Sequence, residues 1–306
     1  MKILVTGGAP DWVAQELKSN GHELVTVTAD AYMDEQKFIE GIQGFDIYVS
    51  GGLEKCTKAV IDSADQLKAI AFLGVDPRNY INLEAAEAKN IPVFSTPGAN
   101  ARAVAELTIL LTLNAARKAA KMFSNLENKI WQNETGFELQ GKTIGLLGSG
   151  PIAQNVAKIA NGFDMEVLYW TRSGEKSSMT GRYVELDDLF QKSDIVSLHI
   201  PKVSGTVIDK SVFEKFKKDA ILINTSPASL VDYPALYEAL SSKKLASAAF
   251  DTFYAEGEKA FTSREAKLLG LGTDRFFLTP HAGWRTVEAD DNMFRIALDC
   301  IKKVAA

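Results

Sequence analysis

Residues 141–155 read Gly-Lys-Thr-Ile-Gly-Leu-Leu-Gly-Ser-Gly-Pro-Ile-Ala-Gln-Asn, and this stretch decides the fold. An apolar strand over 143–147 runs into a glycine turn, and apolar spacing predicts a helix over 152–161. Gly148 allows a tight turn, Gly150 lets the backbone approach a pyrophosphate, and a small residue after them lets the helix pack close to the strand. Pro151 directly precedes that predicted helix, and Ile152 begins it. The stretch predicts a dinucleotide-binding loop, and the alternative is a plain glycine turn in an α/β protein.

The next predicted strand, over 166–169, leads into a basic and hydroxylic loop. An NAD-binding fold usually presents an acidic residue to the ribose 2′-hydroxyl at this point, and none stands here. Arg172 can stack on adenine and hold a 2′-phosphate, with Thr171 and Ser173 assisting. We therefore expect NADP to be preferred, with NAD also possible. In the alternative interpretation Arg172 is a solvated loop charge, and Glu175 is a mild signal against a phosphate.

Composition limits the function classes that the chain can belong to. It has 306 residues, 46% hydrophobic and 24% charged, which favours two domains with sizeable cores. No apolar run approaches the roughly 20 residues that span a membrane. The net charge of −5 and the lack of a basic block argue against a nucleic acid partner. Cys56 and Cys300 show no metal-type spacing, so we expect reduced thiols, no metal site and a cytoplasmic protein.

Strand and helix patterns alternate along the whole chain, which predicts parallel sheets covered by helices. The expected strands cover 2–6, 23–27, 47–49, 69–72, 92–94, 143–147, 166–169, 195–198, 220–224, 246–250 and 276–278. A long apolar helix over 103–117 follows Pro97-Gly98, and a last helix over 287–304 closes the chain. This order fits an α/β fold of two doubly wound domains, one inserted into the other.

Several separate motifs, in the right order, resemble the D-isomer-specific 2-hydroxyacid dehydrogenase family over nearly the whole chain. The matching stretches are 90–93, 96–100, 104–106, the glycine loop, 194–201, 223–225, 230–232, 235–236, 239–240, 250–253 with Glu256, and 278–284. Trp284 after the last histidine is similar to the glycerate dehydrogenase and hydroxypyruvate reductase branch.

The resemblance implies an NAD(P)-dependent enzyme that interconverts a 2-oxo acid, or a related carbonyl compound, and its D-2-hydroxy form. It implies a flavodoxin-like substrate domain from residues 1–97 plus 285–306 and a Rossmann cofactor domain over 98–284, with catalysis in the cleft between them. A homodimer built partly on the helix over 103–117 is also implied, although the helix pattern alone equally fits plain core.

Hydride transfer to a carbonyl needs a general acid, and imidazole has a suitable pKa. The chain has three histidines, His22, His199 and His281. His281, in Thr-Pro-His, matches the family's acid/base, and Glu256 matches the carboxylate that orients it. His22 is interpreted as a surface residue. For Glu256 the alternative is an exposed loop acid, and Gly257 replaces the proline that usually follows.

Further contacts are expected from the resemblance. The expected cofactor contacts are Gly148, Gly150, Pro151, Ile152, Thr171, Arg172, Ser173, His199, Ile200, Pro201, Thr225, Ser226, Pro227, Asp251 and Gly283. Among these, Asp251 is expected to face the nicotinamide carboxamide and Gly283 to allow close approach of the cofactor. For His199 a structural role is an equal alternative. Leu73, Gly74 and Val75 match the family's substrate-facing turn.

One expected residue is missing. The family normally reads Asn-Thr-Ala-Arg-Gly where this chain has Pro227 at the arginine position, and that arginine binds the substrate carboxylate. Arg285 is our first candidate for a replacement, followed by Arg102 and Arg78, and each has the alternative of an ordinary surface arginine. The loss leaves a second hypothesis open, namely a cofactor-binding regulatory or interaction protein with little or no turnover.

Overall fold

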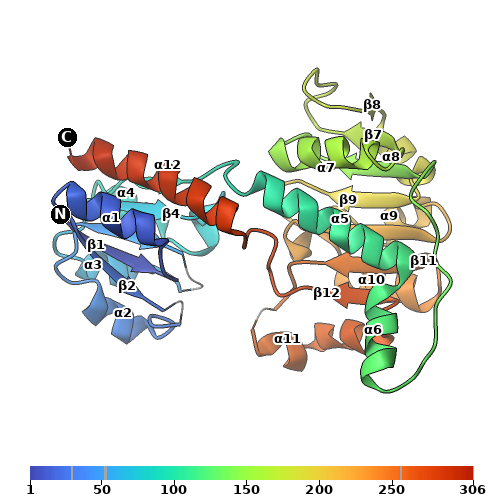
Figure 1. The fold of residues 1–306 in the computed structure, drawn as a ribbon, viewed down its shortest axis with the longest axis horizontal. Coiled ribbons are helices and arrows are strands. Elements are labelled where there is room, and N and C mark those ends of the chain that lie inside the picture. Colours follow the sequence, from blue (N-terminus) through green and yellow to red (C-terminus); the bar gives the residue numbers. More distant parts are fainter. Residues whose placement is uncertain (29, 52–53, 256, 306) are drawn as a thin grey trace. The chain divides into compact units, whose positions relative to one another are not determined.

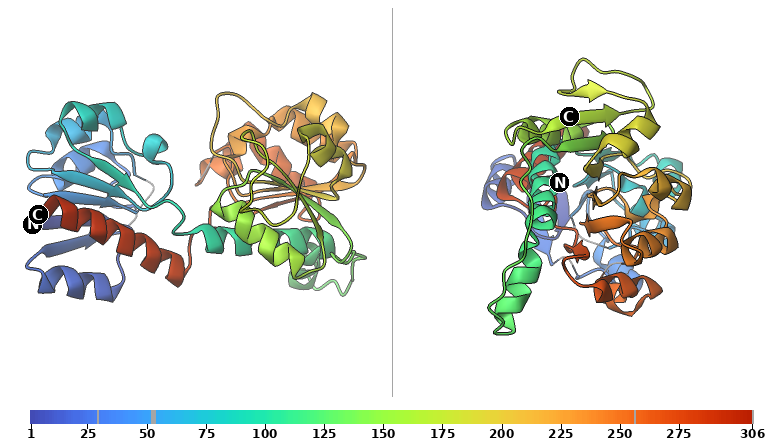
Figure 2. Two further views of the ribbon diagram at one scale, coloured as in Figure 1. Left: turned by 90° about the horizontal axis from the view of Figure 1, so that it is seen from above. Right: turned by 90° about the vertical axis from the view of Figure 1, so that its right-hand side faces the viewer.

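The computed structural model describes every residue except 29, 52–53, 256 and 306, and the chain divides into two compact units. Unit 1 contains Met1–Asn100 and Arg285–Ala306, and unit 2 contains Ala101–Trp284. Each unit is built on one parallel sheet with helices on both faces (Figure 1, Figure 2). Within the described ranges, no helix has the length and apolar character that crossing a bilayer needs.

The sheet of unit 1 has five strands in the order β2-β1-β3-β4-β5, which is the flavodoxin-like doubly wound order. These strands are β1 Lys2–Thr6, β2 Glu23–Val27, β3 Ile47–Ser50, β4 Ala69–Phe72 and β5 Val93–Ser95. The helices of unit 1 are α1 Asp11–Ser19, α2 Glu35–Gly41, α3 Lys58–Ser63, the 3₁₀ turn η1 Pro77–Asn79, α4 Leu83–Ala88 and α12 Val287–Ala305.

Alternate strand residues of unit 1 face two separate cores, because successive side chains of a strand point to opposite faces. Leu4, Tyr48 and Ile70 pack under α2, α3 and α4. Val5 and Val49 pack on the other face, against α1 and α12. The C-terminal helix α12 therefore helps to cover one face of a sheet whose strands all come from the first hundred residues.

The sheet of unit 2 has seven strands in the order β12-β11-β10-β9-β6-β7-β8, which is the doubly wound order of a Rossmann domain. These strands are β6 Thr143–Leu147, β7 Glu166–Trp170, β8 Arg182–Tyr183, β9 Ile195–Leu198, β10 Ala220–Asn224, β11 Leu245–Phe250 and β12 Phe276–Leu278. The helices of unit 2 are α5 Ala101–Arg117, α6 Ala119–Glu127, α7 Pro151–Asn161, α8 Leu186–Lys192, α9 Lys210–Lys215, the 3₁₀ turn η2 Ala228–Leu230, α10 Tyr233–Ser241, α11 Lys259–Thr262 and the 3₁₀ helix η3 Arg264–Leu271.

Two layers of helices cover the sheet of unit 2. Helices α5 and α7 bury one face, where Ala153 and Val156 of α7 pack against Ile144 of β6. Helices α8, α9 and α10 bury the other face, with Phe190 and Leu236 in the core. The predicted fold class, an α/β protein with two doubly wound parallel sheets, is confirmed.

Candidate active site

The residues expected to contact a cofactor gather at one edge of the unit 2 sheet. All its strands are parallel, so their carboxyl ends meet at that edge (Figure 1). The residues that directly follow strands β6, β7, β9, β10, β11 and β12 are Gly148, Thr171, His199, Thr225, Asp251 and Thr279. The chain leaves β6 toward β7 on one side and returns to β9 on the other. Ligands of doubly wound sheets bind at such a switch point.

The two glycines of the loop after β6 differ in why a side chain is absent at each position. Gly148 has φ +121°, and a Cβ placed on it would lie 2.2 Å from the backbone oxygen of His199. Gly150 has extended backbone, with φ −71° and ψ 179°, and no atom lies within 4 Å of the place a Cβ would take. Packing therefore requires Gly148, whereas Gly150 leaves open space beside the loop.

Helix α7 begins beside that open space with free backbone donors. Its N-cap is Gly150, no side chain caps it, and Pro151 holds the first position. The N–H groups of the first turn of such a helix attract an anion, helped by the helix dipole. The residues present therefore fit the pyrophosphate of a dinucleotide.

The loop after β7 is held by hydrogen bonds at Lys176, and the residues at its start are more exposed. The Tyr169 hydroxyl accepts a hydrogen bond from the Lys176 backbone N–H at 2.8 Å and donates one to the Lys176 carbonyl at 3.2 Å. Arg172 and Ser173 between them are exposed, and Thr171 is half-buried. In the described part of the chain Arg172 has no ion-pair partner, so its guanidinium is available to an anion.

His199 follows β9 and is built into the sheet edge. Its Nε2 lies 2.9 Å from the Ser197 hydroxyl, and burial lowers the pKa of His199 to about 3. The imidazole is therefore neutral at physiological pH. Its backbone oxygen packs against Gly148, so the residue shapes the glycine loop through its main chain.

Side-chain hydroxyls join the carboxyl ends of three neighbouring strands. The Ser226 hydroxyl accepts from the Ile200 N–H at 3.2 Å and donates to the Leu198 carbonyl at 3.0 Å, which ties β10 to β9. The Thr252 hydroxyl donates to the Ser226 carbonyl at 2.6 Å, which ties β11 to β10. Pro227 follows Ser226 in this hydrogen-bonded segment. It is half-buried and has no backbone N–H that could donate a hydrogen bond. Pro201, at the other end, is exposed.

Asp251 holds the segment that carries His281. Its Oδ1 accepts from the Thr279 hydroxyl at 2.5 Å and from the Ala282 N–H at 2.9 Å, and its Oδ2 accepts from the Gly283 N–H at 2.9 Å. The residue is 2% exposed. The carboxylate thus fixes the main chain of residues 279–283. A contact between this carboxylate and the cofactor, which the family resemblance implies, stays a prediction.

Backbone geometry supports the same view of this turn. His281 has φ +53°, in the left-handed region that is uncommon for residues other than glycine. Its N–H donates to the Asp251 carbonyl at 2.8 Å, so main chain and side chain of Asp251 together fix the turn. A Cβ on Gly283 would lie 2.9 Å from the Asp251 Oδ2. The group that approaches this glycine closely in the structure is therefore the Asp251 carboxylate. Glu256, the expected partner of His281, lies outside the described residues.

The substrate-facing turn expected from the sequence lies at the carboxyl end of β4 in unit 1. Leu73 donates its N–H to the Ser50 carbonyl at 2.9 Å, and Gly74 accepts from the Thr96 N–H at 2.8 Å. Val75 is 55% exposed. The turn is therefore rigid in its main chain and presents an apolar side chain to solvent.

Two of the three candidate arginines are paired locally. Arg78 binds Asp76 through two contacts, of 2.8 and 2.6 Å, and Arg102 binds Glu106 at 2.6 Å. Arg285 is exposed at the start of the C-terminal segment of unit 1. Burial raises the pKa of Asp290, and the positive charge of Arg285 offsets part of that rise.

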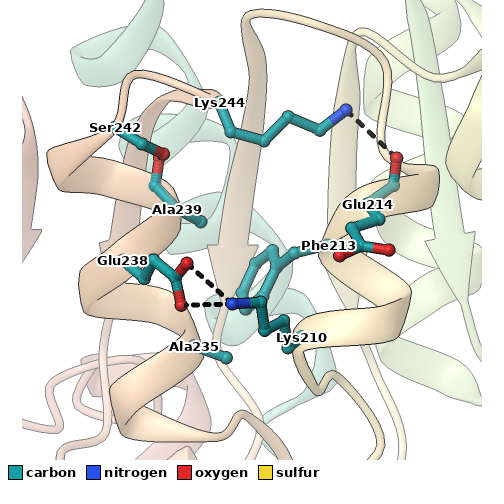
Figure 3. Close-up of a pocket in the computed structure, with 8 residues that line it drawn as sticks. All are labelled: Lys210, Phe213, Glu214, Ala235, Glu238, Ala239, Ser242 and Lys244. Atoms are coloured by element: carbon teal, nitrogen blue, oxygen red, sulfur yellow. Dashed lines mark hydrogen bonds and ion pairs between the residues drawn. The ribbon is translucent and has the colours of Figure 1, made fainter.

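A surface pocket of unit 2 lies between α9 and α10, apart from these residues (Figure 3). Lys210 forms an ion pair with Glu238 at 2.8 Å across its mouth, and the Lys244 ammonium donates to the Glu214 carbonyl at 3.1 Å. None of the expected site residues lines it. Its charged groups are used in joining two helices.

The sequence interpretation missed Thr279 and Ser197, the side chains that bind Asp251 and His199. Ser197 lies in β9, and His199 follows two residues later, directly after the strand. Extended backbone at this spacing places both side chains on one face of the sheet, so the spacing was a usable signal. The Thr279–Asp251 bond joins residues 28 apart, and only the pairing of β11 with β12 brings them together.

Comparison with known proteins agrees with the fold. Residues 109–283 match the family model described as D-isomer specific 2-hydroxyacid dehydrogenase, NAD binding domain. A hydroxypyruvate reductase of Thermotoga maritima is 35% identical over 96% of this chain and 94% of that protein.

Solved structures of the same fold are similar over the whole chain. The TT0316 protein of Thermus thermophilus is 29% identical with a TM-score of 0.87, covering 100% of this chain and 97% of that one. An acyclic imino acid reductase in complex with NADPH and D-Arg is 27% identical with a TM-score of 0.80, covering 99% and 96%.

The doubly wound sheet and the family model together define a dinucleotide-dependent oxidoreductase. The chain belongs to the D-isomer specific 2-hydroxyacid dehydrogenase family. It is an enzyme that binds a nicotinamide cofactor, NAD at least, and acts on a small molecule.

Proposed function

We propose that the protein interconverts a 2-oxo acid, or a related carbonyl compound, and its D-2-hydroxy form, with NADP(H) preferred over NAD(H). One observation carries the proposal: His281 stands on a strained turn that Asp251 fixes, at the sheet edge where the glycine loop begins. Strained backbone held by its surroundings is typical of functional sites. The regulatory alternative is not favoured, since the similar proteins are named as enzymes.

His281 is the general acid/base. In reduction its imidazolium gives a proton to the carbonyl oxygen as negative charge develops there, and in oxidation the neutral imidazole takes the proton of the hydroxyl. Glu256 orients the ring and favours its protonated form. The nicotinamide, when bound, supplies or accepts the hydride at the adjacent carbon.

We assign cofactor binding to the Rossmann domain, expected from the sequence over 98–284, and substrate binding to 1–97 plus 285–306; the structure places residues 98–100 in unit 1. The first turn of α7 binds the pyrophosphate, the segment after β9 lines the adenine side, and Asp251 after β11 faces the nicotinamide. Leu73, Gly74 and Val75 face the substrate. Pro227 cannot anchor a carboxylate, so we assign that role first to Arg285, the arginine nearest in sequence to His281.

The preference for NADP rests on the exposed Arg172. A guanidinium binds a phosphate through paired, charge-assisted hydrogen bonds, and no carboxylate occupies the end of β7. Arg172→Ala should narrow the affinity gap between NADPH and NADH by roughly 1–3 kcal/mol. Fluorescence titration with both cofactors measures it, with Arg182→Ala as a control on the same sheet, and equal wild-type affinities would contradict the preference.

We also infer a homodimer that works in the cytoplasm. The exposed apolar side chains on and after α6 support the dimer, because four large ones follow one another there: Phe123, Leu126, Ile130 and Trp131.

The test of the activity is a screen with NADPH and NADH in parallel against glyoxylate, pyruvate, hydroxypyruvate and uncharged carbonyl compounds. We expect turnover with at least one 2-oxo compound, and poor rates with glyoxylate and pyruvate because the usual arginine is missing. Loss of one preorganised donor costs about 10²–10³ in rate. Cofactor binding without turnover of any carbonyl compound would overturn the proposal.

A further inference from the structure

The loop that joins β7 to β8, residues 171–181, begins with a hydrogen-bonded turn. The Gly174 N–H donates to the Thr171 carbonyl at 3.0 Å, and Gly174 has φ +75°. Arg172 and Ser173 are the two residues inside this turn, and both are exposed. The turn fixes the main chain at Arg172, but the direction in which the whole turn points depends on what holds the rest of the loop.

A buried tyrosine holds the middle of the loop. Tyr169 of β7 is 1% exposed, and its hydroxyl binds both main-chain polar groups of Lys176, the N–H at 2.8 Å and the carbonyl at 3.2 Å. Its ring packs edge-on against Tyr183 of β8, with ring centroids 5.7 Å apart. The position of Lys176 is therefore set by a side chain of the sheet.

A glutamine near the start of α7 holds the end of the loop. The Gln154 Nε2 donates to the Ser149 carbonyl at 3.0 Å and to the Ser178 hydroxyl at 3.4 Å. A side-chain amide has two N–H donors, so one residue joins the glycine loop after β6 to the loop after β7. Met179, which follows Ser178, is buried in the core of unit 2 and fixes the same end.

The contact between Gln154 and Ser149 also acts on the glycine loop. The Ser149 carbonyl and the Gly150 N–H belong to one planar trans peptide unit, so they point in opposite directions. By holding the carbonyl, Gln154 directs the Gly150 N–H away from its own side chain. One side chain therefore orients a backbone donor beside the assigned pyrophosphate site and also holds the loop that carries Arg172.

We propose that Tyr169 and Gln154 are positioning residues that set the preference for NADPH, by holding the loop 171–181 in the form in which Arg172 meets the 2′-phosphate. The inference rests on the proposed cofactor preference and names two residues on which that preference depends. NADPH differs from NADH only in this phosphate, so a displaced loop weakens the binding of NADPH more than that of NADH. A loop that is ordered beforehand also loses less conformational entropy when the cofactor binds.

The ratio of the Kd for NADH to the Kd for NADPH, measured by fluorescence titration, tests the proposal. Tyr169→Phe removes only the hydroxyl, and Gln154→Ala removes the amide. Each variant should lower the ratio about 3–10-fold, the scale of one neutral hydrogen bond. Loss of stability alone does not distinguish the two cofactors, so the ratio separates positioning of the loop from a purely structural role.

Each test variant has a matched control. Asn155 is the neighbouring amide on α7 and is also half-buried, but its Nδ2 donates to the Pro151 carbonyl of the same helix at 2.9 Å. Asn155→Ala is therefore the control for Gln154→Ala, and Tyr183→Phe, at the ring neighbour of Tyr169, is the control for Tyr169→Phe. Both controls should keep the wild-type ratio. An unchanged ratio in a test variant, or an equal fall in its control, would overturn the assignment of that residue.

A double-mutant cycle tests the route from Gln154 to the loop. Ser178→Ala removes the hydroxyl that Gln154 binds and leaves the contact with Ser149 in place. It should lower the affinity ratio as well, and the double variant Gln154→Ala/Ser178→Ala should fall no further than Gln154→Ala alone. Independent, additive falls would show that the two side chains act separately and would overturn this route.

Hydrogen exchange of residues 171–181 in the cofactor-free protein separates this inference from the proposed cofactor preference. Mass spectrometry should find faster exchange in Tyr169→Phe and Gln154→Ala, and wild-type exchange in the two controls. A wild-type protein that binds NADH as tightly as NADPH would overturn the preference, and faster exchange in the two variants would then leave them only as anchors of the loop. A wild-type preference for NADPH that both variants retain would leave the preference standing and overturn the inference. Unchanged exchange in both variants would overturn the anchoring itself.

Discussion

At the scale of single residues, His281 combines an unusual backbone with the assigned proton transfer. Its φ of +53° lies in the left-handed region, where asparagine is tolerated better than most residues. His281→Asn should therefore keep the turn and remove the acid/base, whereas alanine would add backbone strain. We expect a fall in kcat of about 10²–10⁴ with an unchanged Kd for NADPH and an unchanged Tm.

Steady-state kinetics, cofactor titration and thermal unfolding of one protein preparation check this prediction. His22→Asn, at a histidine of unit 1, is the control for the loss of an imidazole. A His281→Asn enzyme with wild-type kcat would move the proton transfer to another group.

A second residue-scale prediction concerns the pH dependence of stability. Burial holds the pKa of His199 at about 3, below its ordinary value of 6.5. The unfolded chain binds the proton more readily, so the contribution to stability is complete above pH 6.5 and is lost as the pH falls from there toward 3. His199→Gln, which keeps a partner for Ser197, removes this dependence.

Urea unfolding at pH 7 and pH 5 measures the difference. Between these two values the wild-type protein should lose about 2 kcal/mol more unfolding free energy than the variant. The same pH dependence in both proteins would show that His199 does not titrate with a low pKa.

At the scale of elements, the turn between β6 and α7 allows two glycines to be tested against each other. Gly148 lies against the His199 backbone with φ +121°, so Gly148→Ala should destabilise unit 2 by about 2–4 kcal/mol, from strain and a backbone clash. Gly150 has an ordinary extended conformation and open space, so Gly150→Ala should leave Tm of the cofactor-free protein nearly unchanged. The new methyl group would occupy the space that we assign to the pyrophosphate, and the Kd for NADPH should rise at least tenfold.

Thermal unfolding without cofactor and fluorescence titration with NADPH give the two readouts. If Gly150→Ala bound NADPH as the wild-type protein does, the first turn of α7 would not be the phosphate site. A stable Gly148→Ala protein would contradict the steric argument for the loop.

Elements of the core could be predicted from the sequence because their patterns are local. The strands Lys2–Thr6, Thr143–Leu147 and Ala220–Asn224 have the bounds expected from apolar runs between turn residues. The two-residue strand Arg182–Tyr183 was missed, since it pairs only at the outer edge of the sheet and has no apolar run of its own. Short helices such as Lys58–Ser63 were also missed, although Thr57 caps this one with a visible N-cap signal.

The candidate site could be predicted only in part. The glycine loop is a contiguous motif, so its position at the ligand edge followed from sequence. The hydrogen bonds of Asp251 depend on strands β11 and β12 lying side by side. Contacts that exist only after strands pair are not encoded in any local pattern.

At the scale of the whole molecule, the exposed apolar side chains predict where two copies of the chain contact each other. The helix over 103–117, on which the family resemblance places the contact, is largely buried within its own unit, with Leu110 as its one exposed large apolar residue among those described. Helix α6 instead projects from the body of unit 2 (Figure 2), and the residues named above as Phe123, Leu126, Ile130 and Trp131 form an apolar α6 surface with Trp131 93% exposed.

Water-exposed apolar area of this kind is stabilised when a second copy covers it. Replacing Phe123 and Trp131 together by serine removes the two largest side chains of the α6 surface, and neither packs in the core of unit 2. The double variant should therefore be monomeric, with the far-ultraviolet circular dichroism of the wild-type protein. Phe261→Ser, at a 75% exposed phenylalanine of α11 in the same unit, is the control and should stay dimeric. Light scattering after size-exclusion chromatography distinguishes the states, and a wild-type monomer, or a double variant that remains a dimer, would exclude the α6 surface as the interface.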